Sequence, residues 1–235
     1  LYLDLTVVEN IRLFAGIYGL SRTETEARLR WIVGMAGLDS YEGDLVSRLP
    51  MGVRQRLALG CALVHRPPVL FLDEPTSGVD PIGRRRFWEI LLRLAREDGV
   101  AILITTHYMS EAEHCDQLAL MFAGRIVSDG SPREMKQSVE QHIGRLIELV
   151  TDHSTDAAAA LTNAGLTNIS LFGAKVHVLS LQPDQDVPRI RDVLAAHRIG
   201  LHTVTFPPLS LEDVFVSRVM VLEKQEQAAT PGAVA

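Results

Sequence analysis

The stretch Val69-Leu-Phe-Leu-Asp-Glu-Pro-Thr-Ser-Gly-Val-Asp80 decides the fold. Four apolar residues lead into Asp73 and Glu74, and Pro75 follows at once. An apolar run that ends in polar residues is typical of a buried strand of a parallel sheet. Open α/β sheets bind ligands at the carboxyl ends of their strands, where two carboxylates can hold Mg²⁺ beside a nucleotide and orient an attacking water. A strand that ends in a solvated turn has the same pattern, so the flanking sequence has to decide.

A second strand-like run, Val100-Ala-Ile-Leu-Ile-Thr-Thr-His107, begins apolar and ends in polar residues. The residues between the two runs have the length and apolar spacing of a crossover helix, and such crossovers are right-handed. Both strands then end at the same edge of the sheet. A lone histidine after a strand is usually structural, but the shared edge favours a functional role. We therefore predict that Asp73, Glu74 and His107 converge.

A loop-to-helix transition precedes the central stretch. The loop Leu49-Pro-Met-Gly52 runs into a strongly helical segment, which His65-Arg-Pro-Pro68 ends. The free backbone amides at a helix start bind anions, and Arg54 and Arg56 add positive charge. The sequence therefore predicts an anion-binding helix start at Gly52.

The rest of the chain changes character along its length. Thr6-x-x-Glu9 and Ser21-x-x-Glu24 both fit a capping box and predict two amphipathic helices within residues 1–38. From about residue 143, short strands and helices alternate in the order β-α-β-β-α-β, which resembles a small split sandwich. The predicted organisation is α/β, with a helical part at about 1–65, a sheet part at about 66–138, a small α+β domain at 139–222 and a flexible tail at 223–235.

Composition sets broad limits. The chain has 235 residues, of which 47% are hydrophobic and 22% charged, and its net charge of -6 argues against a nucleic-acid partner. Cys61 and Cys115 belong to no CxxC pair, so both are expected to be buried thiols. No apolar run approaches the roughly 20 residues that span a bilayer, and the first residues given do not have the basic-then-apolar pattern of a signal peptide. Because the first residue is Leu1, we expect the natural amino terminus to be missing.

Together, these stretches resemble the ATP-binding subunit of an ABC transporter. Gly52-x-x-Gln55-Arg56 resembles the end of the signature loop, Leu70 to Asp80 resembles the Walker B and D-loop segment, and Thr105-Thr-His107 resembles the switch histidine. The resemblance covers residues 1 to about 138 and implies an incomplete P-loop NTPase-like domain. The later segment, with Ser210-Leu-Glu-Asp-Val-Phe215, resembles the accessory domain of exporter-type ATPases that serve ABC-2-like permeases.

The resemblance implies a role for each matched residue. Asp73 would help to hold Mg²⁺, Glu74 would polarise the attacking water, and His107 would contact the γ-phosphate of ATP. Ser77 and Asp80 would communicate across a head-to-tail dimer of ATPase domains. The residues implied in nucleotide contact are Leu49, Pro50, Met51, Gly52, Gln55, Ser77, Gly78 and Asp80. The partners implied are a second ATPase domain and a membrane permease, with the protein placed peripherally on the cytoplasmic face of the membrane.

Two departures from the family pattern stand out. No Gly-x-x-x-x-Gly-Lys-Ser/Thr phosphate loop occurs in the 235 residues. Because the family's phosphate loop lies upstream of the part matched here, we expect a truncated chain that is inactive alone. The signature loop reads Leu-Pro-Met-Gly where the family favours Leu-Ser-Gly-Gly. Pro50 supplies no donor, and Met51 adds bulk where glycine lets the backbone approach phosphate.

Two alternative functions remain open. One is a non-catalytic interaction or regulatory module of an ABC assembly. The other is a soluble ABC protein that acts on ribosomes, although the sequence contains no long basic linker and carries the exporter-like accessory domain.

Overall fold

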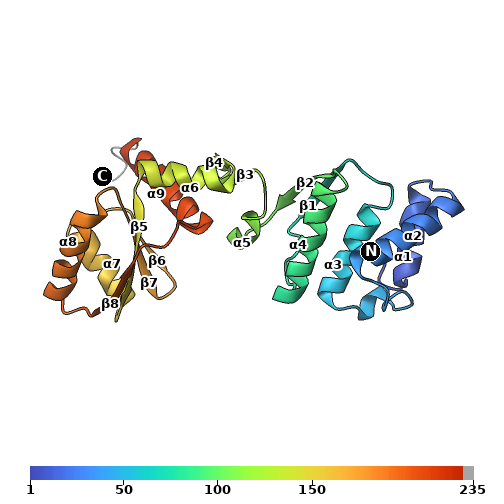
Figure 1. Cartoon of the computed structure of the whole chain (residues 1–235), viewed down its shortest axis with the longest axis horizontal. Coiled ribbons are helices and arrows are strands. Elements are labelled where there is room, and N and C mark those ends of the chain that lie inside the picture. Colours follow the sequence, from blue (N-terminus) through green and yellow to red (C-terminus); the bar gives the residue numbers. More distant parts are fainter. Residues whose placement is uncertain (230–235) are drawn as a thin grey trace, which may run out of the picture. The chain divides into compact units, whose positions relative to one another are not determined.

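The computed structural model describes residues 1–229 (Figure 1). The chain divides into two compact units, Leu1–His107 and Tyr108–Ala235. The first unit contains, in chain order, α1 (Val7–Ile17), α2 (Arg22–Ala36), the 3₁₀ turn η1 (Val46–Arg48), α3 (Met51–Ala62), β1 (Val69–Asp73), α4 (Pro81–Arg96) and β2 (Ala101–Thr105).

The first two helices begin where the capping boxes predict. Thr6 caps α1 and Ser21 caps α2, and in both boxes the glutamate at the third helical position accepts the backbone N–H of the cap. The apolar stripes of α1, α2 and α3 form one core, whose largest fully buried side chains include Ile11, Ile32 and Leu57. The predicted helical part is therefore confirmed at the level of its elements.

Helices α2 and α3 approach each other closely. A Cβ added at Gly60 of α3 would lie 2.4 Å from Cγ2 of Ile32, so only glycine fits there. Arg28 of α2 donates from Nη2 to the carbonyl of Leu63 at 2.7 Å and from Nε to the carbonyl of Val64 at 3.0 Å. These carbonyls lie at the carboxyl end of α3, where the helix itself supplies no donors, so Arg28 stabilises that end.

Strands β1 and β2 pair in parallel, as predicted, with Asp73 opposite Thr105. The expectation of a buried strand is wrong for most of the side chains, since three of the five in each strand are exposed. Leu70 is 5% exposed, but Phe71 is 73% exposed and its ladder partner Leu103 is 61% exposed. Alternate side chains of a strand point to opposite faces, and within the described residues only one face of this two-stranded sheet is covered.

The second unit has an antiparallel hairpin and a four-stranded sheet. Its elements in chain order are α5 (Met109–Ala112), β3 (Leu118–Phe122), β4 (Arg125–Gly130), α6 (Pro132–His142), β5 (Arg145–Thr151), α7 (Ser154–Asn163), β6 (Ile169–Phe172), β7 (Lys175–Ser180), α8 (Pro183–Ala196), β8 (Leu201–Thr205) and α9 (Leu211–Ala229). The dipeptide Ala123-Gly124 between two strand-like segments predicts a hairpin, and the antiparallel pairing of β3 with β4 confirms it. Ala123 and Gly124 join β3 to β4 with φ values of 48° and 75°, the left-handed pair that a tight two-residue turn requires.

The four-stranded sheet has the order β6-β7-β5-β8, and every neighbouring pair is antiparallel. This confirms the predicted β-α-β-β-α-β sequence of elements. Side chains such as Val176 and Val178 pack with α7 and α8 on one face, whereas Leu146 and Leu179 pack with α6 and α9 on the other. Figure 1 shows the two helix pairs on opposite sides of the sheet.

The boundaries differ from the predictions in two places. The predicted division at residue 138 falls inside α6, and the assignment of the two parts to an ATPase domain and an accessory domain stays a prediction. Helix α9 continues to Ala229, beyond the predicted end at Leu222, so residues 223–229 do not form the expected tail. The remaining tail positions, 230–235, lie outside the described residues. In the described part of the chain, no helix combines the length and the apolar character that crossing a membrane requires.

We predict that Gly144→Ala destabilises the second unit by about 2–4 kcal/mol. Gly144 has a φ of 123°, and a Cβ there would lie 2.1 Å from the backbone carbon of Ser180, which cannot move without displacing β7. Gly173→Ala is the matched control, since its φ is 59° and no atom lies within 4 Å of the added Cβ. It should cost only about 1–2 kcal/mol, the price of a left-handed alanine. Urea unfolding followed by circular dichroism measures both, and equal costs would contradict the steric argument.

Candidate functional site

The predicted convergence at the edge of the parallel sheet is present in the structure. Asp73 ends β1 and Thr105 ends β2, and the two are ladder partners. The backbone N–H of Glu74 donates to the carbonyl oxygen of Thr105 at 3.1 Å. The carboxyl ends of β1 and β2 therefore lie beside each other. Asp73, Glu74 and His107 therefore lie together at the carboxyl edge, where α/β proteins place their ligands.

Glu74 and His107 face each other. Nδ1 of His107 lies 3.2 Å from Oε1 of Glu74, and the two side chains are 54% and 48% exposed. Glu74 has a φ of 41°, in the left-handed region that residues other than glycine rarely adopt. A non-glycine residue held in that region at the end of a strand is often found at functional sites. The pair combines a carboxylate that can accept a proton with an imidazole that can donate one, and both remain open to solvent.

Asp73 suits a magnesium ion that is shared with phosphates. Thr105 donates from Oγ1 to Oδ1 of Asp73. The other carboxylate oxygen of Asp73 accepts no hydrogen bond from the described residues, and the side chain is exposed. Mg²⁺ commonly takes one or two carboxylates and completes its shell with water and substrate phosphates. Asp73 can supply one such carboxylate. Among the described residues, no cluster of three or more acidic, histidine or cysteine side chains could bind a metal ion by itself.

The sequence interpretation missed Thr105. Its hydroxyl contacts both carboxylate-bearing residues, because Oγ1 also accepts the backbone N–H of Glu74 at 3.1 Å. The available signal was a polar residue at the last position of an otherwise apolar strand, directly opposite the aspartate once the two strands are aligned in parallel. That signal requires the register, which the sequence does not specify.

The segment after Glu74 forms a tight turn. The N–H of Ser77 donates to the carbonyl of Glu74 at 3.1 Å, and Gly78 turns the chain with a φ of 71°. Ser77 and Gly78 are exposed. Asp80 caps α4 by accepting the N–H of Gly83 at 2.9 Å, and Pro81, which has no N–H to leave unpaired, occupies the first helical position. The structure thus gives Asp80 a structural role, and its predicted role across a dimer stays a prediction.

The predicted nucleotide-contacting loop lies at the start of α3, which begins at Met51 and not at Gly52. Leu49 is buried in the helical core, whereas Pro50 and Met51 are exposed. Gly52 packs against the turn before α4, since a Cβ there would lie 3.2 Å from Cγ1 of Val79. The structure therefore brings Gly52 beside the Val79–Gly83 segment, while Gln55 is half-buried on α3.

The two arginines expected to strengthen an anion site at this helix start point elsewhere. Arg56 is 8% exposed and donates from Nη1 to the carbonyls of Ala36 and Gly37, the latter at 3.0 Å. It therefore caps the carboxyl end of α2, and burial lowers the pKa of its guanidinium. Arg54 folds back toward the carbonyls of Ser47 and Leu49, each at 3.4 Å. Because the carbonyls at the end of α2 hold the Arg56 guanidinium, the prediction that Arg56 adds positive charge to the helix start at Gly52 is wrong.

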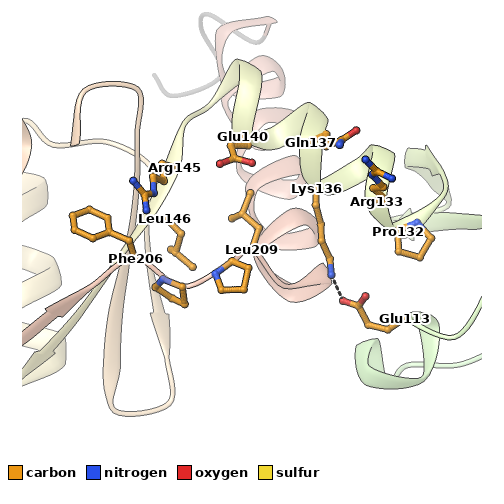
Figure 2. A pocket seen from close by; sticks show the side chains of 12 residues that line it. Glu113, Pro132, Arg133, Lys136, Gln137, Glu140, Arg145, Leu146, Phe206 and Leu209 are labelled. Carbon is orange, nitrogen blue, oxygen red and sulfur yellow. Dashed lines mark ion pairs between the residues drawn. The ribbon is translucent and has the colours of Figure 1, made fainter. Parts of the chain in front are cut away.

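A separate pocket of about 690 Å³ lies in the second unit, between α6 and the segment Phe206–Leu209 (Figure 2). At one end Arg145 stacks over the ring of Phe206, 4.8 Å from its centroid, and at the other Lys136 pairs with Glu113 at 2.5 Å. None of the residues predicted to contact nucleotide lines this pocket. We therefore assign it no part in nucleotide chemistry.

Comparisons with known proteins identify the family to which the chain is similar. A family profile described as "ABC transporter" matches residues 1–77. The chain is 44% identical over 136 residues to the "Probable multidrug ABC transporter ATP-binding protein YbhF" of Escherichia coli K12, which covers 58% of this chain and 23% of that protein. It is 32% identical over 214 residues to the "Nod factor export ATP-binding protein I" of Rhizobium sp. strain N33. This match covers 91% of the present chain and 67% of that protein.

The fold comparison points the same way. The dimeric post-hydrolysis structure of the ATP-binding cassette MJ0796, bound to ADP and phosphate, matches with a TM-score of 0.50 and 26% identity, over 56% of this chain and 58% of that one. The α/β architecture is thus that of solved ABC ATP-binding subunits. The chain spans less than a quarter of YbhF and about two thirds of the Nod factor export protein.

Proposed function

Because the chain belongs to the family of ABC transporter ATP-binding proteins, we propose that it is part of an ATPase that drives export through a membrane permease. The observation that carries this proposal is the Glu74–His107 contact beside Asp73 at the carboxyl edge of two parallel strands. The names of two relatives, a multidrug transporter protein and a Nod factor export protein, support export as the direction of transport.

Each residue at the edge has a proposed task. Glu74 polarises the water that attacks the γ-phosphate, because its carboxylate is solvent-accessible and held by a fixed backbone. His107 keeps that carboxylate oriented and contacts the γ-phosphate. Asp73 holds Mg²⁺, which when bound offsets the negative charge of the phosphates. Proton acceptance and positioning by this chain's own side chains are therefore the chemistry that it contributes.

A second ATPase domain, arranged head to tail, is the proposed partner at the exposed loops. Pro50 and Met51 at the start of α3, and Ser77 and Gly78 in the turn before α4, are open to solvent in this chain. The matching MJ0796 structure is dimeric, which supports a dimer of ATPase domains. The permease partner and a peripheral position on the cytoplasmic face of the membrane belong to the same proposal.

One observation favours a non-catalytic module as the second candidate. Pro50 precedes α3 without any side-chain hydrogen bond to the helix start, and Met51 is 45% exposed there, where the family's serine and glycine would offer donors and space. A module of this kind would bind a partner ATPase domain and permease without turning over ATP. The two candidates differ in whether a protein that contains this chain and a phosphate loop hydrolyses ATP.

We predict that the chain of residues 1–235 alone neither binds ATP tightly nor hydrolyses it. Most nucleotide affinity in such folds comes from the amide cradle and lysine of a phosphate loop, and the 235 residues contain no such motif. The exposed carboxylates of Asp73 and Glu74 repel a triphosphate when no cradle and no Mg²⁺ offset their charge.

Calorimetric titration of this chain with ATP and Mg²⁺ tests the prediction, and phosphate release measured on a version that carries a phosphate loop tests the proposed function. We expect no saturable binding in the first experiment and Mg²⁺-dependent release in the second. Micromolar binding by the chain alone would overturn the prediction. Absence of hydrolysis by the version with a phosphate loop would favour the non-catalytic candidate.

A further inference from the structure

The hydroxyl of Thr105 connects the two acidic residues of the site. Thr105 is the last residue of β2 and the ladder partner of Asp73. We propose that Thr105 is a positioning residue for ATP hydrolysis, which fixes the orientation of Asp73 and the backbone of Glu74 at once. This inference rests on the proposed function. It assigns a role to a residue other than Asp73, Glu74 and His107, which the sequence predicted to converge.

The hydrogen of the Thr105 hydroxyl and one of its lone pairs are both engaged in hydrogen bonds. A threonine hydroxyl has one hydrogen to donate and lone pairs to accept. Its hydrogen goes to Oδ1 of Asp73, and its oxygen accepts the N–H of Glu74 at 3.1 Å. Because the donor is directed at Oδ1, the other carboxylate oxygen of Asp73 is left available to a shared Mg²⁺.

The same hydroxyl supports the unusual backbone of Glu74. The N–H of Glu74 is held by two acceptors of one residue, the carbonyl oxygen and Oγ1 of Thr105, both at 3.1 Å. Glu74 then turns with a φ of 41°, and that turn directs its carboxylate to His107. Without the hydroxyl, the hydrogen bond from Glu74 N–H to the carbonyl oxygen of Thr105 would remain, but the hydrogen bond to Oγ1 that also holds the turn would be lost.

The fold itself does not require a hydroxyl at this position. Valine has the shape of threonine and is equally suited to a strand, and the Thr105 side chain is exposed. The hydrogen bonds of the Thr105 hydroxyl therefore position Asp73 and Glu74 and contribute little to the packing of the strand. Thr105→Val removes those contacts while it preserves shape, and Thr105→Ser retains them.

The decisive experiment compares these two variants in a version of the protein that carries a phosphate loop. Thr105→Val should lower kcat, and should raise the Mg²⁺ concentration needed for half-maximal rate, each by about tenfold or more, as is usual when the partner of a metal ligand is removed. Thr105→Ser should stay close to wild type in both. Thr203→Val on β8 is the matched control, because its exposed hydroxyl makes no hydrogen bond among the described residues.

A readout independent of turnover uses the chain of residues 1–235. Amide hydrogen exchange of Glu74, resolved by NMR, should quicken by several-fold in Thr105→Val and remain slow in Thr105→Ser, since one of two acceptors is lost. The inference is overturned if Thr105→Val matches wild type in kcat and Mg²⁺ dependence, or if serine and valine are equally impaired. If wild type itself fails to hydrolyse ATP, the proposed function falls and the inference with it. If Glu74→Gln stops hydrolysis while Thr105→Val does not slow it, only the inference fails.

Discussion

In a protein that carries both this chain and a phosphate loop, Glu74→Gln should keep nucleotide binding and lower ATP hydrolysis by about 10²- to 10⁴-fold, the range for loss of a general base. Glutamine has nearly the same shape and can still contact His107, but its amide cannot polarise water as a carboxylate does. The left-handed backbone of Glu74 is held by Thr105 and not by its own side chain, so the site should keep its geometry.

The measurements are single-turnover hydrolysis and calorimetric binding of ATP with Mg²⁺. Glu97→Gln, at the exposed end of α4, removes the same charge away from the edge and should leave both values unchanged. Unhydrolysed ATP should accumulate in trapped dimers of the Glu74→Gln protein. Turnover near the wild-type rate would show that another group positions the water.

The second large effect concerns His177, which lies buried between two carboxylates in the second unit. Its Nδ1 lies 2.7 Å from Oδ1 of Asp213 on α9, and its Nε2 lies 3.1 Å from Oε2 of Glu148 on β5. The ring also stacks on Phe172 at 4.8 Å between centroids. Two acceptors on opposite nitrogens require two N–H donors, so the folded state favours the charged imidazolium.

The pKa shifts set the pH dependence of this cluster. Burial alone would lower the pKa of His177, but the hydrogen bonds and charges of Asp213 and Glu148 raise it above its ordinary value. Burial would raise the pKa of Asp213, but its hydrogen bonds to His177 and Ser210 lower it. The hydrogen bond from Lys175, together with those from His177 and Thr205, lowers the pKa of Glu148 against the effect of burial.

The direction of each pKa shift determines how the stability of the second unit changes with pH. The stabilisation from His177 is complete below its unfolded pKa and is lost as pH rises through the raised folded value. The stabilisation from Asp213 and Glu148 is complete above their unfolded pKa values and is lost as pH falls through the lowered folded values. The cluster should therefore contribute most between about pH 4.5 and 6.5.

His177→Gln should lower the free energy of unfolding of the second unit by about 3 kcal/mol near pH 6, because it leaves two carboxylates together with too few donors. The loss should shrink as pH rises. Both tryptophans, Trp31 and Trp88, lie in the first unit, so tryptophan fluorescence cannot report this transition, and hydrogen-exchange mass spectrometry of β7 and α9 peptides can.

His202→Gln is the matched control for His177→Gln. His202 pairs with Asp152 at 2.6 Å, but its side chain is 58% exposed, so the substitution should cost less than about 1 kcal/mol. A pH-independent loss at His177, or equal losses at the two histidines, would show that burial of the charged cluster is not what stabilises this unit.

Local rules in the sequence predicted the parts of the fold that depend on neighbouring residues. The capping boxes at Thr6 and Ser21 depend on residues three apart, and the Ala123-Gly124 turn depends on two adjacent residues. The convergence of Asp73, Glu74 and His107 was also predictable, because parallel pairing forces both strand ends to one edge.

The missed features are long-range and depend on register or on competition for hydrogen bonds. Thr105 could be placed opposite Asp73 only after the two strands were aligned. Arg56 was expected to face an anion, but the open carbonyls at the end of α2, 19 and 20 residues away, attract it instead. His177 and Asp213 are separated by 36 residues, and no local pattern links them.

The outward face of the parallel sheet has a consequence for the protein in solution. This face carries a stripe of exposed apolar side chains, formed by Val69 and the ladder partners Phe71 and Leu103. Attraction between such stripes on different molecules makes the second virial coefficient less positive, whereas the net charge of -6 makes it more positive. Salt screens the repulsion and leaves the apolar attraction in place. We therefore expect this chain to stay monodisperse in dilute, low-salt buffer and its light scattering to rise as salt is added.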